Sequence, residues 1–289
     1  MDNKIILITG ATGGIGKAAA IVLAKQGHTI VIHGRDRQKT QAVCEEIKTT
    51  TGNPNIDLLT GDLFLTTDVR KVAQAFKARY NRLDVLINNA GGIMNKTREN
   101  TSEGIEKTIA VNLVAPFLLT ELLLDLLKKS PDGRIVNVSS NSHKLNAKPD
   151  FDDLQLAQNY DPLRAYGNAK LFLIWISQRL AASLKQEGIA NVTVNTLHPG
   201  AVASSFGVNS NLGSALNFFA KLARPFFKTV EQGADTVIYL ASSNATKGIS
   251  GQYFVNRKPS KVADKYHTAA QEKLVWDFCE TVTGVKSGV

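Results

Sequence analysis

A tyrosine and a lysine four residues apart, Tyr166 and Lys170, are the residues of this sequence best suited to acid–base chemistry. They begin a long apolar run, Leu171–Leu184, which predicts a helix, and a helix places positions i and i+4 on one face. An ammonium about 4 Å from a phenol, at an effective dielectric of about 20, is worth roughly 4 kcal/mol, or about three pKa units, before desolvation opposes the shift. We therefore expect Lys170 to lower the pKa of Tyr166 until the phenol can exchange protons near neutral pH. A surface tyrosine with a nearby lysine is the alternative for an isolated match.

The start of the chain has the pattern of a phosphate-binding turn. A continuous aliphatic run, Ile5–Ile8, predicts a buried parallel strand, and the alanine-rich stretch after residue 16 predicts a helix. Between them, Gly10, Gly14 and Gly16 allow a tight turn and a close approach to a pyrophosphate. The helix that follows presents free N–H groups and the positive end of its dipole. A glycine-rich turn alone is weak evidence for a nucleotide site, but its place between strand and helix makes the evidence strong.

The end of the second predicted strand, Thr29–Gly34, bears on the choice of dinucleotide. An acidic residue at this point favours NAD, whereas an arginine accommodates the 2′-phosphate of NADP. Gly34 stands where we expect the acid, and Arg35 follows it. Asp36 argues for NAD, but its simpler role is to cap a helix beginning at Arg37. The local charges therefore predict NADP(H), with Arg35 on the phosphate.

Helical and strand patterns alternate along all 289 residues, without a linker or repeat, which predicts one α/β domain over residues 1–289. We expect a doubly wound, Rossmann-like fold with a seven-stranded parallel sheet flanked by helices. The other predicted strands are Ile56–Leu59, Val85–Asn88, Arg134–Ser139, Val192–Leu197 and Gln252–Val255. A C-terminal extension, about 257–289, adds a helix around Ala269–Val282.

Several function classes are disfavoured. The net charge of +9 comes from scattered basic residues without interleaved aromatics, which predicts a solvated basic surface and no nucleic-acid partner. Cys44 and Cys279 lie far apart without metal-like spacing, so we expect reduced thiols and no metal site. Met1 leads directly into the first strand, and no apolar run approaches the ~20 residues that span a bilayer. The expected location is cytoplasmic.

Three more segments complete an ordered set of motifs. Asn88-Asn89-Ala90-Gly91 closes the fourth strand, Asn112 lies inside an apolar helix, and Ser139-Ser140 closes the fifth strand. His198-Pro199-Gly200 follows the sixth strand. Together with the glycine turn and the Tyr166–Lys170 pair, this set resembles the short-chain dehydrogenase/reductase superfamily. The resemblance extends from about Lys4 to Asn256, with every motif in the family's order.

The resemblance implies a role for each matched residue. Ser140 would hold the substrate oxygen, Tyr166 would be the general acid in reduction and the general base in oxidation, and Lys170 would bond the nicotinamide ribose. Asn112 would anchor a water that passes protons to Lys170. Asp62 would lie beside the adenine, and the turn at residues 199–202 would hold the carboxamide through its backbone. The residues expected to touch the cofactor are Gly10, Thr12, Gly14, Ile15, Gly16, Arg35, Asp62, Leu63, Asn89, Ala90, Gly91, Tyr166, Lys170, Pro199, Gly200, Val202 and Ser204.

Simpler roles stay open for some of these residues. Asn89 either contacts the ribose region or stabilises the central strand, and Asn112 either serves the site or is a satisfied packing group. Some NADP-using relatives carry a basic residue in the glycine turn, where this chain has Thr12. That departure leaves Arg35 as the main phosphate partner, with Arg37 or Lys39 as further candidates. Neither His143 nor His198 is needed for the implied chemistry, and both are interpreted as pocket or loop residues.

Two regions narrow the resemblance. Twenty-five residues separate Ser140 from Tyr166, about twice the length found in compact members, and the chain continues well past the seventh strand. Both features, together with Gly251-Gln252-Tyr253-Phe254, look like the retinol-dehydrogenase-like branch. Many animal members of that branch begin with a membrane-anchoring segment that we do not find here.

The predicted substrate loop covers about residues 201–230. Within it, Leu212, Leu216, Phe219 and Leu222 recur at near-helical spacing among further phenylalanines, Phe206, Phe218, Phe226 and Phe227. This apolar stripe packs on the core, or forms a mobile lid over a hydrophobic substrate, or makes a shallow membrane contact aided by Lys221, Arg224 and Lys228.

The sequence thus predicts an NADP-dependent carbonyl reductase or alcohol dehydrogenase acting on a small hydrophobic carbonyl or alcohol substrate. The runner-up is oxidation of a lipid-like, steroid or retinoid alcohol. A dinucleotide-responsive binding protein is the non-enzyme alternative, disfavoured because Ser140, Tyr166, Lys170 and Asn112 are all present. The extended C-terminus leaves both a homodimer and a monomer open.

Overall fold

A computed structural model describes residues 3–202 and 227–287. Its centre is a sheet in the order β3-β2-β1-β4-β5-β6-β7-β8, parallel except for β8. The strands are β1 (Ile5–Ile8), β2 (Thr29–Gly34), β3 (Ile56–Thr60), β4 (Val85–Asn88), β5 (Gly133–Val138), β6 (Val192–His198), β7 (Tyr253–Val255) and β8 (Lys258–Pro259). The helices are α1 (Gly14–Lys25), α2 (Arg37–Thr51), α3 (Thr66–Lys77), α4 (Lys107–Ile109), the π-helical turn η1 (Ala110–Val114), α5 (Ala115–Lys128), α6 (Ser142–Leu145), α7 (Pro162–Gln186), α9 (Val230–Ser242), the 3₁₀ turn η3 (Asn244–Thr246) and α10 (Ala269–Thr283).

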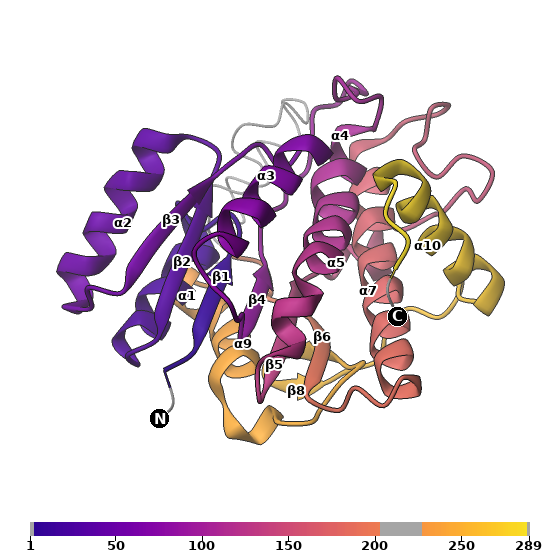
Figure 1. Cartoon of the computed structure of the whole chain (residues 1–289). Helices are drawn as coiled ribbons and strands as arrows, with labels where there is room; N and C mark the ends of the chain where they lie inside the picture. Colours follow the sequence, from indigo (N-terminus) through magenta and orange to yellow (C-terminus); the bar gives the residue numbers. More distant parts are fainter. Residues whose placement is uncertain (1–2, 203–226, 288–289) are drawn as a thin grey trace.

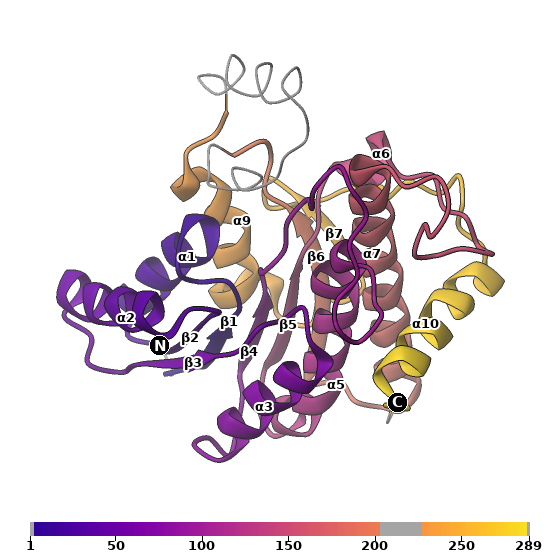
Figure 2. The same ribbon diagram turned by 90° about the horizontal axis from the view of Figure 1, so that it is seen from above.

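Helices cover both faces of the sheet, as the doubly wound prediction requires (Figure 1, Figure 2). Along β1, Ile6 and Ile8 join the core under α1, α2 and α9, whereas Leu7 joins the core under α3, α5 and α7. Successive side chains of a strand point to opposite faces, so a strand buried on both sides must be aliphatic throughout. This explains why β1 has no polar alternation. The α/β fold class is therefore confirmed.

All seven predicted strands are present, with ends within one residue of those expected. The count of seven was nevertheless too low, because β8 pairs antiparallel with β7 and makes the sheet eight-stranded. The turn between them places Asn256 at φ 50° and Arg257 at φ 62°. Two left-handed residues are typical of a tight hairpin, which usually carries glycine. An Asn-Arg pair is not a recognised signal for such a turn, so β8 was not predicted from the sequence.

The prediction that no apolar segment approaches the length needed to span a bilayer was wrong. Within the described ranges, the continuous helix Lys107–Lys128 has 22 residues and a mean hydropathy of 1.8 over its most apolar window, which suffices by length and composition to cross a membrane. In the structure 83% of that window is buried. Such burial is what the core helix of a globular domain shows. The helix contributes Leu118, Leu119 and Leu123 to the main core, each at most 1% exposed.

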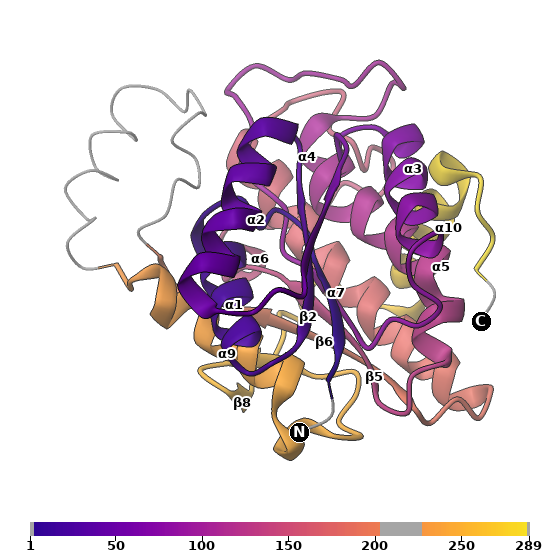
Figure 3. The same ribbon diagram turned by 60° about the vertical axis from the view of Figure 1, so that its left-hand side comes forward.

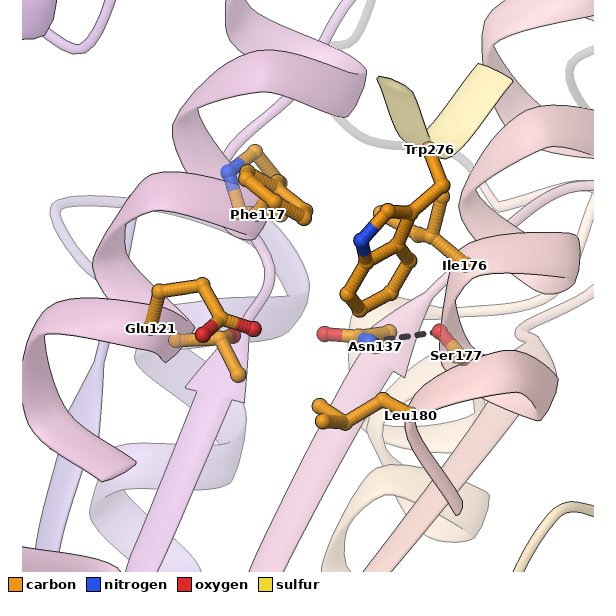
Figure 4. Close-up of a pocket in the computed structure, with 9 residues that line it drawn as sticks. Phe117, Glu121, Asn137, Ile176, Ser177, Leu180 and Trp276 are labelled. Carbon is orange, nitrogen blue, oxygen red and sulfur yellow. Dashed lines mark hydrogen bonds between the residues drawn. The ribbon is translucent and has the colours of Figure 1, made fainter. Parts of the chain in front are cut away.

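The C-terminal helix was predicted correctly, and it packs against α7 and α5 on the outer side of that helical layer (Figure 1, Figure 3). Its anchor is Trp276, whose ring meets Phe117 edge-on at 5.1 Å between centroids. The Arg179 guanidinium lies 5.4 Å from the same indole. Figure 4 shows this ring beside the side chain of Ile176 and above that of Leu180. Both cysteines, Cys44 on α2 and Cys279 on the buried face of α10, are free and buried.

Removing the Trp276 ring should destabilise the whole domain. Trp276→Ala deletes a side chain that is 5% exposed, and we expect it to lower the free energy of unfolding by about 3–5 kcal/mol. Leu274→Ala, on the same helix but 38% exposed, is the matched control and should cost only about 0.5 kcal/mol. Equilibrium denaturation by urea measures both. Equal losses would show that α10 does not depend on this anchor.

Candidate active site

A cleft of about 1060 Å³ runs along the carboxyl ends of the parallel strands. Ligands of open α/β sheets bind at this edge, where the strand order reverses between β1 and β4. The predicted site residues found in its lining are Gly10, Thr12, Gly14, Ile15, Arg35, Asp62, Leu63, Asn89, Ala90, Gly91, Ser140, Tyr166, Lys170, Pro199, Gly200 and Val202. Two others, Gly16 and Asn112, lie behind the wall of the cleft, and Ser204 falls outside the described residues.

The glycine turn leaves the start of α1 open toward the cleft. Gly10 and Gly14 take positive φ angles of 64° and 54°, which explains two of the three glycines. The cap position of α1, Gly13, offers no side-chain hydrogen bond, and the first turn carries no acidic residue. The backbone N–H groups and the positive dipole end are therefore left for a ligand. This is the donor set that a dinucleotide pyrophosphate requires.

The third glycine serves packing against Asn89. A Cβ at Gly16 would lie 2.5 Å from the Asn89 amide nitrogen, which itself donates to the Thr9 and Gly10 carbonyls at 2.8 and 3.2 Å. The end of β4 is thus bonded directly to the glycine turn. Two roles were left open for Asn89, and these hydrogen bonds are the ones expected if Asn89 stabilises the end of the central strand.

At the adenosine end, the contacts of Gly34 and its neighbours agree with the predicted charge logic. A Cβ at Gly34 would clash with the Thr12 methyl and the Thr40 hydroxyl, so no acidic side chain fits at this point. The Asp36 carboxylate caps α2 by accepting the Lys39 N–H at 2.7 Å. Arg35 lines the cleft, is exposed and makes no hydrogen bond or ion pair to any described residue. A guanidinium without a partner in the described ranges is therefore available to a ligand.

The predicted catalytic side chains converge on the opposite end of the cleft. Ser140 follows β5, and its side chain hydrogen-bonds Tyr166 on α7. The Ser140 Oγ also accepts the Ser142 N–H at 3.2 Å, which leaves the hydroxyl hydrogen for the phenol oxygen. One turn along α7, the Lys170 Nζ lies 5.7 Å from the centre of the Tyr166 ring. A substrate oxygen placed here would meet two hydroxyl groups.

The protonation states differ from the prediction. Burial raises the pKa of Tyr166 above its usual value, and the hydrogen bond from Ser140 opposes this shift only in part. Burial also lowers the pKa of Lys170 to about 7, so its charge is partly lost near neutrality. The Lys170 ammonium donates to the Val138 carbonyl at 2.9 Å. The expected lowering of the Tyr166 pKa by Lys170 is therefore not found in the protein alone, because the burial of both groups outweighs the attraction between them.

Asn112 lies in the π-helical turn η1 and joins two parts of the site. Its amide donates to the Gly92 and Thr108 carbonyls at 2.9 and 2.8 Å, and its carbonyl accepts the Gly92 N–H at 3.1 Å. These bonds tie the loop after β4 to the core helix. π-turns are often found at functional sites, and this one replaces the regular helix that the apolar pattern indicated. The water-relay role of Asn112 stays a prediction.

The long segment before Tyr166 is fixed by residues inside the Tyr-x-x-x-Lys motif. A Cβ at Gly167 would lie 2.7 Å from the Ala147 backbone nitrogen, so only glycine allows this segment to cross α7 here. Asn168 accepts the Lys148 N–H at 2.8 Å. Neither residue is singled out by a pattern in the sequence. Gly167 and Asn168, between the two motif residues, therefore have a structural role that the motif itself does not indicate.

Glu106 is a further residue that sequence reasoning missed. Its buried carboxylate caps α4 by accepting the Thr108 and Ile109 N–H groups, both at 2.8 Å. Tyr160, from the long segment, donates to the same carboxylate at 3.4 Å. Burial raises the pKa of Glu106. The carboxylate thus links the long segment to the helix that carries Asn112.

The turn after β6 closes the nicotinamide end. Gly200 has φ 92°, and its N–H donates to the His198 Nδ1 at 3.0 Å. Val202 forms a parallel bridge with Lys228, which returns the chain after the gap in the described residues. His198 lines the cleft, whereas His143 does not. The interpretation of His198 as a pocket residue therefore agrees with its position.

Apolar side chains also line the cleft. Those described are Phe64, Ile93, Met94, Leu145, Leu163 and Phe227. Leu145 is 74% exposed, an unusual state for a leucine. Most of the predicted substrate loop, including Phe206, Leu212, Leu216, Phe218, Phe219, Lys221, Leu222, Arg224 and Phe226, lies outside the described residues. Among its described members, Phe227 borders the cleft and Lys228 bonds Asn256 at 2.7 Å.

Comparison with known proteins agrees with this geometry. The family model described as short chain dehydrogenase matches residues 4–215. Retinol dehydrogenase 12 of Mus musculus is 36% identical over 99% of this chain and 88% of its own length. Polyprenol dehydrogenase of Homo sapiens is 35% identical over 98% of this chain and 86% of its own length. A short-chain dehydrogenase from Shigella flexneri 2a, solved with NADP, superposes with a TM-score of 0.65 at 27% identity, covering 88% of this chain and 97% of its own.

The motifs, the cleft and these similarities agree along nearly the whole chain. Ser140, Tyr166 and Lys170 stand at one end of a dinucleotide-sized cleft, and the open N-terminus of α1 stands at the other. We conclude that this chain is an NAD(P)-dependent oxidoreductase of the short-chain dehydrogenase family, in its retinol-dehydrogenase-like branch.

Proposed function

We propose that this protein uses NADP(H) and reduces hydrophobic, lipid-like aldehydes or ketones to alcohols. The observation that carries the proposal is the cleft itself. Arg35, which bonds no residue in the described parts of the chain, lies at one end, and the Ser140–Tyr166 pair lies at the other. When bound, the nicotinamide dinucleotide supplies the hydride for the carbonyl carbon. The names of the relatives, which refer to retinol and polyprenol, support a lipid-like substrate.

The chain's own residues account for the proton. Ser140 and Tyr166 donate hydrogen bonds to the substrate oxygen, and Tyr166 transfers its proton to that oxygen as negative charge develops there. Because burial raises the pKa of Tyr166, the phenol is protonated at neutral pH and is ready to act as an acid. Lys170 holds the ribose edge of the cofactor site and can return a proton to Tyr166.

Oxidation of a lipid-like alcohol is the second candidate, favoured by the relatives' names as dehydrogenases. It uses the same residues in reverse, with Tyr166 as the base. The raised pKa of Tyr166 opposes that direction in the protein alone. Charging of Lys170 on cofactor binding would favour it, so both directions call for a direct assay.

The decisive assay follows absorbance at 340 nm with NADPH and NADH. Retinal and a long-chain prenyl aldehyde are offered against benzaldehyde, a small aromatic aldehyde. Turnover of the lipid-like aldehydes with NADPH, absent in Tyr166→Phe, is the expected result. Turnover of benzaldehyde alone would refute the lipid-like substrate class. Absence of turnover in either direction, with cofactor bound, would refute the proposed activity.

The preference for NADPH should depend on Arg35. A charge-assisted hydrogen bond is worth about 1.5–3 kcal/mol, so Arg35→Gln should weaken NADPH binding about 10- to 150-fold. The affinity for NADH, which lacks the 2′-phosphate, should change little. Arg37→Gln is the matched control. Arg37 was a further candidate for the phosphate, but it is exposed and does not line the cleft, so its replacement should change neither affinity. Fluorescence titration of the wild type and both variants with each cofactor measures the six affinities. Equal losses for NADH and NADPH would contradict the assignment.

A further inference from the structure

His143 lies directly behind Ser140, buried and outside the cleft. It is 1% exposed, one residue into the short helix α6, and it does not belong to the cleft lining. Its Nδ1 lies 2.6 Å from the Ser140 carbonyl oxygen, and its backbone N–H donates to the same oxygen at 3.2 Å. One carbonyl therefore receives two hydrogen bonds from one residue. Those bonds fix the peptide on which the Ser140 hydroxyl stands.

The hydrogen bond decides which nitrogen of the ring carries the proton. A carbonyl oxygen only accepts, so Nδ1 must be the protonated nitrogen and Nε2 must be bare. The Nε2 atom is buried without a hydrogen-bond partner among the described residues. Burial lowers the pKa of His143 to about 4, so the ring stays neutral at the pH of the proposed reaction.

Tyr253 holds the ring from the other side. It stands on β7, is 2% exposed, and meets the His143 ring edge-on at 4.9 Å between centroids. Its hydroxyl is likewise buried without a partner in the described parts of the chain. Two buried polar atoms without partners in those parts, one on each of two rings in contact, are unfavourable for folding alone. The hydrogen bond to the Ser140 carbonyl explains the arrangement, because it fixes the orientation of the His143 ring and leaves Nε2 without a described partner.

We infer that His143 is a positioning residue of the reaction, which orients the Ser140 hydroxyl toward Tyr166 by donating its Nδ1 hydrogen to the Ser140 carbonyl. The inference rests on the proposed function, since Ser140 is assigned to the substrate oxygen there. A hydroxyl displaced by about 1 Å loses much of its effect, which can cost about 100-fold in rate. His143 itself touches neither substrate nor cofactor.

Three substitutions separate positioning from packing. In His143→Asn, the amide nitrogen takes the place of Nδ1 and keeps the hydrogen bond. In His143→Gln, the amide reaches only as far as Nε2, and His143→Leu fills the space without a donor. We expect His143→Asn to keep kcat within about threefold, and the other two to lower it about 10- to 100-fold. The NADPH affinity should be unchanged in all three.

A packing role gives the opposite order, because leucine suits a buried apolar slot better than asparagine does. Equal kcat losses in His143→Asn and His143→Gln, or a better kcat in His143→Leu than in His143→Asn, would overturn the inference. Nitrogen-15 NMR of histidine-labelled wild-type protein tests it without turnover, since a protonated Nε2 would also overturn it. The NMR result stands even if no substrate is reduced, so failure of the proposed function is recognised separately by wild-type turnover.

Discussion

Tyr166→Phe is expected to lower kcat by about 10²- to 10⁴-fold, the range that a positioned general acid contributes. The substitution removes only the hydroxyl, since the ring is 5% exposed and phenylalanine fills the same space. The phenol oxygen receives a hydrogen bond from Ser140, which the substitution also removes. Stopped-flow or steady-state absorbance of NADPH oxidation measures the loss.

The control for this variant is cofactor binding. The phosphate-binding turn and Arg35 lie at the other end of the cleft, so the NADPH affinity of Tyr166→Phe should stay within about threefold of wild type. A variant that loses both turnover and binding would point to a structural role for the hydroxyl. Turnover retained at the wild-type rate would refute the catalytic assignment of Tyr166.

Residues that act through their type and local spacing could be predicted from the sequence. The aliphatic run of β1 followed by glycines indicated both the sheet and the open helix end, and the structure agrees. The capping role of Asp36 was likewise visible, because a carboxylate before a helix has few other uses. Local patterns of this kind depend on interactions between residues that are close in the sequence, so they can be predicted without knowledge of the rest of the fold.

Residues that act through distant contacts could not be predicted. Glu106 gains its importance from Tyr160, 54 positions away, and His143 from Tyr253, 110 positions away. The predicted direction of the Tyr166 pKa shift was wrong for the same reason. Four-residue spacing fixes the neighbour, whereas the burial that determines the pKa comes from the whole fold.

Cofactor binding should take up a proton at Lys170. Burial lowers the pKa of this ammonium from 10.5 to about 7, so at pH 8 about nine-tenths of the side chains are neutral in the cofactor-free protein. The phosphates and ribose hydroxyls of a bound dinucleotide favour the charged form and raise the pKa again. At pH 8 we therefore expect an uptake of close to one proton per NADPH bound. Calorimetric titration in two buffers with different ionisation enthalpies measures this number.

The sign of the same shift predicts the stability of the cofactor-free protein. Between pH 7 and about 10.5 the unfolded chain holds a proton on Lys170 that the folded chain has released, so this group's contribution to stability rises with pH. Lys170→Met should abolish both the rise and the proton uptake, while Lys25→Met, an exposed control on α1, should abolish neither. Proton uptake that persists in Lys170→Met would assign it to another group. A charged Lys170 would also lower the pKa of Tyr166. Cofactor binding would therefore restore the charge on Lys170 and, through it, bring the pKa of Tyr166 closer to neutrality.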